Sequence, residues 1–319
     1  MKKNDWDLIK TSNKLKIRKG TLDTFIKDLD IVRPTLKKLK ILHQRTIKKS
    51  TLISGRGLHS GVKTGLILSP LPTDSGIIFG NISTGETIHA NLDYVESTEF
   101  ATSLKKNNSY AKTIEHFMAA LHAYKISNLL IKINDELPIM DGSALDFCQL
   151  IEDAGLEDQE VYQEEIIIDK KYQWGDLKKD IKQIVIEPAD EFSIRYYLDY
   201  PTPVGKQDFY FVMKDALDFK NNIAPSRTFG FLKDINTLEK KGLANGGRLN
   251  NFILIDDEKV VNTKLRFSDE FVRHKILDII GDFYLLGKPI KGAITAHMTG
   301  HMDNISLLKI IRDNLNLYW

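Results

Sequence analysis

Cysteine is almost absent from this sequence. Its 319 residues include one, Cys148, so an intrachain disulfide cannot form and a metal site built from several thiolates is excluded. Any metal ion must therefore be held mainly by histidine, aspartate or glutamate side chains.

Long apolar runs are also lacking. No stretch approaches the roughly 20 apolar residues that a helix needs to span a bilayer, and the N-terminus has no apolar core of the kind found in signal peptides. Mitochondrial transit peptides are poor in acidic residues, whereas the first 30 residues contain Asp5, Asp7, Asp23, Asp28 and Asp30. We therefore expect a soluble, cytoplasmic protein.

The chain as a whole carries no large excess of one charge. Its formal net charge is +2 and 28% of its residues are charged, so the overall balance does not indicate nucleic acid as a partner. The first 50 residues differ, because they hold 15 of the 45 Lys and Arg residues but only 5 of the 43 Asp and Glu residues. We treat residues 1–43 as a basic N-terminal extension whose role the sequence does not reveal.

Apolar residues at helical spacing in this extension predict an amphipathic helix that ends near Pro34. They are Leu22, Phe25, Leu29 and Val32. The interpretation that we favour is a solvated tail or a short helix packed on the rest of the protein. The alternative is peripheral contact with an anionic membrane surface.

The remaining chain predicts an α+β fold with two similar domains, each a mostly antiparallel sheet packed with helices. Strands are expected at residues 46–54, 62–68, 76–79, 87–90, 128–133, 165–169, 183–187, 192–198, 208–212, 252–256 and 293–297. Helices are expected at residues 113–124, 143–154, 232–241, 269–286 and 304–315. The acidic stretch 156–165 has no clear pattern, so we place the boundary there, with domain I at 44–160 and domain II at 161–319.

The segment 271–282 has a spacing suited to a metal ion. His274 and Asp278 are four positions apart in a stretch with helical periodicity, so their side chains share one face of a helix. His116 is the natural third ligand. A catalytic zinc site usually has three protein ligands and leaves the fourth position to water, whose pKa the ion can lower from about 15.7 to near 7.

Two further residues suggest acid–base chemistry. Glu115 could accept the proton of such a water, but adjacent helical residues point about 100° apart, so Glu115 and His116 can face one site only at a helix end or an irregular turn. His301 follows Gly300 on a predicted loop, where it could stabilise charge or protonate a leaving amine.

A simpler interpretation stays open at this point. A His/Asp pair at this spacing is more often a surface hydrogen bond than a metal site, and a Glu-His pair on a helix usually has no function. Asp282 lies one turn beyond Asp278, where it could orient an imidazole or pair with Lys275 or Arg273.

Several longer motifs occur in one order along residues 44–315. They are GLHSG at 57–61, TIEH at 113–116, PIMDGS at 138–143, SRTFG at 226–230, RF at 266–267, DEFVRHK at 269–275, Asp278, GD at 281–282 and GH at 300–301. Long motifs in a fixed order are far more specific than one short pattern. Together they resemble the UDP-3-O-acyl-N-acetylglucosamine deacetylase (LpxC) family, zinc hydrolases of lipid A biosynthesis in Gram-negative bacteria.

The resemblance implies hydrolysis of the 2-acetamido group of UDP-3-O-(3-hydroxyacyl)-N-acetylglucosamine to the free amine and acetate, the committed step of lipid A biosynthesis. The implied metal ligands are His116, His274 and Asp278, for Zn²⁺, although Fe²⁺ could occupy the same ligands. The implied catalytic residues are Glu115 as general base, His301 as charge stabiliser or acid, Asp282 in support of His301, Thr228 as donor to the oxyanion, and Lys275 toward the substrate.

The resemblance also implies a partner, a UDP-linked acylated amino sugar, and a fold whose helices are sandwiched between two sheets. The substrate-binding residues that it implies are Leu58, Asp199, Tyr200, Phe229, Lys275, Arg248 and Phe252. The sequence does not fix the oligomeric state, and we favour a monomer.

Three positions depart from the family pattern. Arg248 and Phe252 stand where small residues are expected along the passage for the acyl chain, so they could narrow that passage or point away from it. Met298 stands where a basic residue often helps to bind the diphosphate. Two other functions remain as hypotheses: a deacetylase for a different acylated amino sugar or nucleotide sugar, and a non-catalytic nucleotide-sugar-binding protein.

Overall fold

The computed structural model describes residues 42–234, 240, 242 and 245–317. The N-terminal helix expected near Pro34 lies outside these residues. In the first half of the chain the strands are β1 (His43–Ile47), β2 (Thr51–Arg56), β3 (Lys63–Pro70), β4 (Ile77–Asn81), β5 (Thr87–His89), β6 (Val95–Ser97), β7 (Ser103–Lys106), β8 (Ser109–Lys112), β9 (Leu129–Ile133) and β10 (Leu156–Tyr162). The helices there are η1 (Leu92–Tyr94), α4 (Glu115–Tyr124) and α5 (Leu145–Ala154).

The second half has a similar content. Its strands are β11 (Ile166–Ile167), β12 (Tyr172–Gly175), β13 (Gln183–Glu187), β14 (Phe192–Asp199), β15 (Lys206–Val212), β16 (Phe229–Phe231), β17 (Ile253–Ile255) and β18 (Ile290–His297). Its helices are α6 (Ala216–Asn222), α8 (Glu270–Phe283), η2 (Tyr284–Leu286) and α9 (His301–Leu315).

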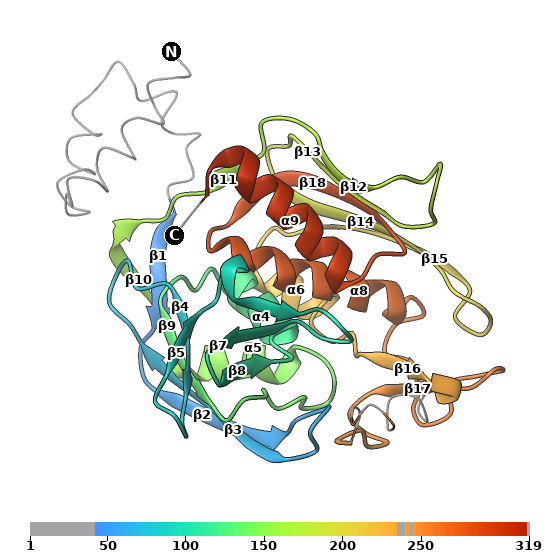
Figure 1. The fold of residues 1–319 in the computed structure, drawn as a ribbon, viewed down its shortest axis with the longest axis horizontal. Coiled ribbons are helices and arrows are strands. Elements are labelled where there is room, and N and C mark those ends of the chain that lie inside the picture. The colour runs from blue at the N-terminus through green and yellow to red at the C-terminus, as the bar shows by residue number, and fades with distance from the viewer. Residues whose placement is uncertain (1–41, 235–239, 241, 243–244, 318–319) are drawn as a thin grey trace.

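Two large sheets enclose a layer of helices (Figure 1). The strand order is β2-β3-β9-β4-β5 in one sheet and β12-β13-β18-β14-β15 in the other, where β11 also pairs with β18. Helix α5 contacts β2, α8 contacts β14 and β15, and α9 contacts β12 and β13. The predicted α+β class, with helices between two sheets, is confirmed.

Both sheets share one topology. If the five strands of each main path are numbered along the chain, their order across the sheet is first, second, fifth, third and fourth. The pair between the fifth and third strands is parallel and the other three pairs are antiparallel. In each half one helix, α4 or α8, precedes the fifth strand, and another, α5 or α9, follows it.

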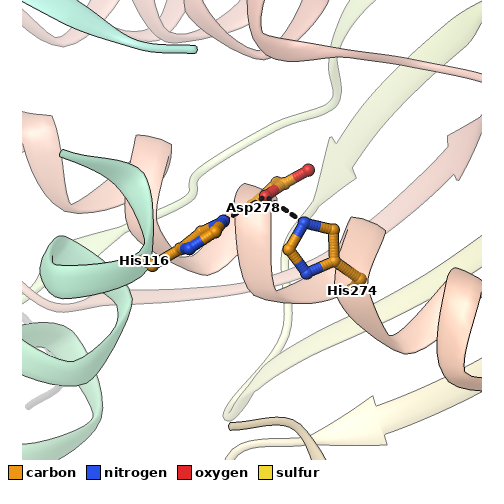
Figure 2. Close-up of side chains that lie close together, drawn as sticks. All are labelled: His116, His274 and Asp278. Carbon is orange, nitrogen blue, oxygen red and sulfur yellow. Dashed lines mark ion pairs between the residues drawn. The ribbon is translucent and has the colours of Figure 1, made fainter. Parts of the chain in front are cut away.

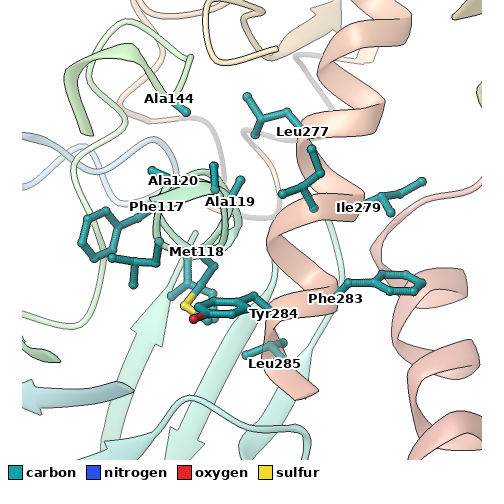
Figure 3. Close-up of a cluster of buried hydrophobic side chains, with 14 of the residues drawn as sticks. Phe117, Met118, Ala119, Ala120, Ala144, Leu277, Ile279, Phe283, Tyr284 and Leu285 are labelled. Atoms are coloured by element: carbon teal, nitrogen blue, oxygen red, sulfur yellow. The ribbon is translucent and has the colours of Figure 1, made fainter. Parts of the chain in front are cut away.

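The helices α4 and α8 pack against each other at the centre of the molecule (Figure 3). Every residue of α4 is buried, as expected for a helix that contacts protein on all sides. The backbones approach closely at Gly281, where a Cβ atom would lie 2.0 Å from the carbonyl oxygen of Glu115. Glycine is therefore required at this contact.

Several expected elements have different bounds. The strand expected at 46–54 is two strands, because the chain turns through the exposed residues 48–50. The first of them, β1, pairs with β10, a strand in the stretch 156–165 that showed no pattern. A two-stranded ribbon with partly exposed faces does not need an apolar alternation, which explains why β10 was missed.

The expected helix 232–241 is described only in part, and its described residues 232–234 and 240 are helical. The domain boundary between residues 160 and 161 stays a prediction; it falls within β10. No helix in the described ranges is both long and apolar enough to cross a membrane.

Candidate active site

Three potential metal ligands converge from both halves of the molecule. His116 comes from α4, whereas His274 and Asp278 come from α8 (Figure 2). Asp278 Oδ1 lies 3.8 Å from His116 Nε2 and 3.4 Å from His274 Nε2. Each of the three residues is 3% exposed, so the simpler interpretation of a surface His/Asp pair is wrong.

The donor set fits a divalent metal ion. Bonds of 2.0–2.2 Å in a tetrahedral zinc site put neighbouring ligand atoms about 3.3 Å apart, close to the two distances found here. Asp278 Oδ1 is buried and has no hydrogen-bond partner, which is costly for a carboxylate oxygen unless a cation meets it. Among the described residues, this cluster is the one group of three suitable side chains.

The surroundings favour the protonation states that metal binding needs. Burial, reinforced by His274, lowers the pKa of His116 to about 3, and burial also lowers the pKa of His274. Burial opposes ionisation of Asp278, but Lys275 and the nearby histidines hold the pKa of its carboxyl well below the usual range. Neutral imidazoles and an ionised carboxylate are the forms that bind a metal.

The outer contacts of these ligands orient them. His274 Nδ1 lies 3.0 Å from the carbonyl oxygen of Ser226, so this nitrogen donates and Nε2 points toward the cluster. Lys275 Nζ donates to Asp278 Oδ2 at 2.8 Å. This bond leaves Oδ1 as the carboxylate oxygen for a metal.

Glu115 is the first residue of α4. Both Glu115 and its neighbour His116 line the cavity, which agrees with the expectation that adjacent residues face one site only at a helix end. The chain enters the helix through Thr113 in a left-handed conformation, with φ of 57°, an outlier for a β-branched residue. Burial raises the pKa of Glu115 to about 7, although the charge of His301 opposes the rise.

His301 begins α9 and does not lie on a loop as expected. Gly300 takes the N-cap position and the Asp303 side chain bonds back to its N–H, so the helix starts three residues before the predicted 304. His301 Nδ1 lies 2.8 Å from Asp282 Oδ2. Burial alone would lower the pKa of His301, but the Asp282 carboxylate raises it to about 9.

The two other partners considered for Asp282 are engaged elsewhere. Lys275 pairs with Asp278, and Arg273 pairs with Asp269 at 2.7 Å. Asp282 therefore pairs with His301 rather than with Lys275 or Arg273, and its supporting role in catalysis stays a prediction.

The segment that carries Thr228 is fixed by a buried ion pair. Arg227 Nε donates to Glu270 Oε1 at 2.8 Å, and the backbone N–H of Arg227 donates to the same oxygen at 3.1 Å. The N–H of Thr228 also donates to the carbonyl of Gly142 at 2.8 Å. These bonds hold Thr228 at the wall of the cavity.

A cavity of about 720 Å³ opens beside the cluster. Among the residues with expected substrate roles, Leu58, Tyr200, Phe229 and Lys275 line it. The ring of Tyr200 meets that of Phe229 edge-on, with centroids 6.0 Å apart. The cavity is large enough for a ligand of the size of a nucleotide sugar.

Three expected substrate contacts do not line this cavity. Asp199 is exposed and its carboxylate lies 3.4 Å from Lys206 Nζ. Arg248 is also exposed, and its guanidinium donates to the carbonyls of Asn245 and Gly247 in its own loop. Phe252 is half-buried.

Sequence reasoning missed several groups that support the site. Thr102 and Asn304 both donate to the Asp282 carboxylate, and the Ser226 carbonyl orients His274. Thr102 belongs to none of the motifs above, so no sequence signal could have found it. Arg227 and Glu270 do stand in motifs, but their pairing joins segments far apart in the chain.

Comparison with known proteins agrees with the family resemblance of the sequence motifs. The family model described as "UDP-3-O-acyl N-acetylglycosamine deacetylase" (LpxC) matches residues 44–313. The chain is similar to the UDP-3-O-acyl-N-acetylglucosamine deacetylase of Helicobacter hepaticus, with 40% identity over 279 residues that cover 87% of this chain and 92% of the relative.

Two other relatives of the same name agree. The protein from Nautilia profundicola is 42% identical over 269 residues, 84% of this chain and 91% of the relative. The protein from Helicobacter pylori strain 26695 is 39% identical over 273 residues, 85% and 91% of the two chains. The chain therefore belongs to the UDP-3-O-acyl-N-acetylglucosamine deacetylase family, a family of hydrolases.

Proposed function

We propose that this chain removes the acetyl group from UDP-3-O-(3-hydroxyacyl)-N-acetylglucosamine in lipid A biosynthesis, at the cavity between its two halves. The observation that carries this proposal is the buried cluster of His116, His274 and Asp278, with one Asp278 oxygen left without a hydrogen bond. Family membership supports the reaction, and the donor set supports a divalent metal, for which we propose Zn²⁺.

A zinc ion held by these three side chains would polarise both a water molecule and the acetamide carbonyl. Glu115 is proposed to accept the proton of the attacking water. Its pKa of about 7 suits this role, because a general base works best when its pKa lies near the working pH.

His301 is proposed to protonate the departing amine nitrogen. With Nδ1 bonded to Asp282, Nε2 is the nitrogen available to the substrate. A pKa of about 9 keeps the ring cationic near neutral pH, so it can also stabilise negative charge at the reacting carbonyl. Thr228, at the cavity wall, is proposed to donate to that oxygen.

The cavity wall supports the proposed substrate class. Lys275 is a cation, since Asp278 raises its pKa above the usual range despite burial, and it is proposed to attract the diphosphate. Leu58, Tyr200 and Phe229 are proposed to contact the sugar, uracil or acyl groups. The exposed positions of Asp199 and Arg248 give no support to roles for them. A cytoplasmic location and a monomeric state remain predictions.

Elemental analysis and an amine-release assay, applied to wild type and Asp278→Ala, test the proposal. We expect one equivalent of metal and turnover in wild type, and loss of both in the variant, because Asp278 supplies one of three ligands. A matched control is Asp208→Ala, whose carboxylate forms an exposed ion pair with Arg195; it should retain metal and activity.

Other results would redirect the proposal. Metal without turnover on this substrate would favour the hypothesis of a related deacetylase for a different acylated amino sugar. No metal in wild type, after purification without chelators and incubation with Zn²⁺, would contradict the hydrolytic site and favour a binding protein.

A further inference from the structure

We propose that Thr102 is a positioning residue that orients both Glu115, the proposed general base, and the His301–Asp282 pair. This inference rests on the roles proposed above for Glu115 and His301. Thr102 is fully buried and lies just before β7, in a segment of the first half that contacts both α4 and α8.

The backbone of Thr102 holds the first turn of α4. Its N–H donates to Glu115 Oε2 at 3.0 Å, and its carbonyl accepts the N–H of Ile114 at 3.3 Å. The Ile114 side chain provides no cap for this helix, and the bond from the Ile114 N–H to the Thr102 carbonyl satisfies one N–H at the start of the helix. The bond to Oε2 also fixes the direction in which the Glu115 carboxylate points.

The side chain of Thr102 reaches the other half of the molecule. Its hydroxyl donates to Asp282 Oδ1 at 2.6 Å. The second oxygen, Oδ2, accepts from His301 Nδ1 and from Asn304 Nδ2, both at 2.8 Å. The Asp282 carboxylate is therefore held by three donors from two segments, Thr102 before β7 and the first turn of α9, and it is 1% exposed.

This arrangement connects the two proposed acid–base residues through one residue, whose backbone N–H bonds to Glu115 and whose hydroxyl bonds to Asp282. If the Asp282 carboxylate could rotate, the His301 ring would lose the contact that keeps Nδ1 away from the substrate and Nε2 toward it. Contacts of this indirect kind commonly affect activity by about 10–100-fold. Removal of the Thr102 hydroxyl should therefore slow the chemical step more than it weakens substrate binding.

Steady-state kinetics of Thr102→Val and Thr102→Ser test this role. Valine keeps the shape and removes the hydroxyl, whereas serine keeps the hydroxyl. We expect kcat to fall about 10–100-fold in Thr102→Val, with KM nearly unchanged, bound metal retained, and Thr102→Ser close to wild type.

The matched control is Thr46→Val. Thr46 is also buried, and its hydroxyl donates to the carbonyl of Asn128, away from the cavity. This variant should lose stability without losing kcat. If Thr102→Val does not fold, Thr102→Ala and Thr102→Ser make the same comparison, because they too differ by a hydroxyl.

A second readout is independent of turnover. In protein labelled with ¹⁵N-histidine, we expect the His301 Nδ1–H proton signal, assigned by its absence in His301→Gln, to shift or broaden in Thr102→Val but not in Thr46→Val. An unchanged signal together with unchanged kcat would overturn the proposal, as would equal losses of kcat in Thr102→Ser and Thr102→Val. If wild type showed no deacetylation, the proposed function would fail, while the NMR signal would still decide whether Thr102 positions His301.

Discussion

The helices α4 and α8 occupy equivalent places in the two halves of the molecule, but their candidate site residues stand at different positions along the helix. On α4 both groups, Glu115 and His116, stand in the first turn. On α8 the groups are His274, Asp278 and Asp282, each one turn beyond the last. Adjacent residues can serve one cavity only where the helix begins, whereas residues four apart can do so along its length.

The helices that follow the fifth strands differ as well. Helix α9 begins directly after a short connection, residues 298–300, and its first residue is His301. Helix α5 begins only after the longer connection 134–144, and its first residue, Leu145, carries no such chemistry. One topology thus supplies the proposed base Glu115 from the first half and the proposed acid His301 from the second, and the cavity that both residues line forms where the halves pack together.

Replacement of the proposed base, Glu115, should have the largest effect on turnover. In Glu115→Gln we expect kcat to fall about 10²–10⁴-fold, because general-base catalysis is lost, while metal bound by the three other side chains is retained. Glu152→Gln is a suitable control, since Glu152 lies on α5 and pairs with Tyr124 and Lys220. Measurements of kcat and metal content check this prediction; loss of metal from Glu115→Gln would mean that Glu115 has a structural role.

A methyl group added at Gly281, which should push α4 and α8 apart, should have a smaller effect on turnover. In Gly281→Ala the new Cβ would meet the Glu115 carbonyl at 2.0 Å, so α4 and α8 must move apart. We expect a stability loss of about 1–3 kcal/mol and a fall in kcat of about 100-fold, the typical cost of a displacement near 1 Å.

The control for this variant is Gly65→Ala, because a Cβ at Gly65 would meet no atom within 4 Å. Thermal unfolding and kcat should both remain near wild type. Similar behaviour of Gly281→Ala would show that the contact between α4 and α8 can relax without moving the base.

The smallest predicted effect is a change with pH in the stability of the metal-free protein. In metal-free protein the pKa of His301 is raised from 6.5 to about 9, so its protonated form stabilises the fold below pH 6.5 and this stabilisation is lost as pH rises through 9. Glu115, raised from 4.5 to about 7, loses its stabilising neutral form in the same direction but at lower pH. Between pH 7 and 9 the slope should approach about 1.4 kcal/mol per pH unit at most.

Denaturant unfolding of metal-free wild type and His301→Gln at several pH values measures this slope. We expect stability to fall from pH 7 to 9 in wild type and to change little in the variant. An equal slope in both proteins would mean that a group other than His301 titrates in this range.

The sequence by itself determined much of this protein. The 3.6-residue period of the segment 271–282 and the motifs around it predicted α8 and the cluster of three potential metal ligands, His116, His274 and Asp278, because local periodicity and residue type are properties of the chain. The order of strands and helices also predicted two similar α+β halves, and the family resemblance implied that helices are sandwiched between their two sheets.

The tertiary structure decided the rest. Whether His301 starts a helix depends on the cap at Gly300, and whether Arg248 faces a cavity depends on its own loop. Thr102 bonds both to Glu115 and, across 180 positions of sequence, to Asp282, and Gly281 lets α4 and α8 approach. Such contacts are fixed by packing between distant segments, which leaves no periodic trace in the sequence.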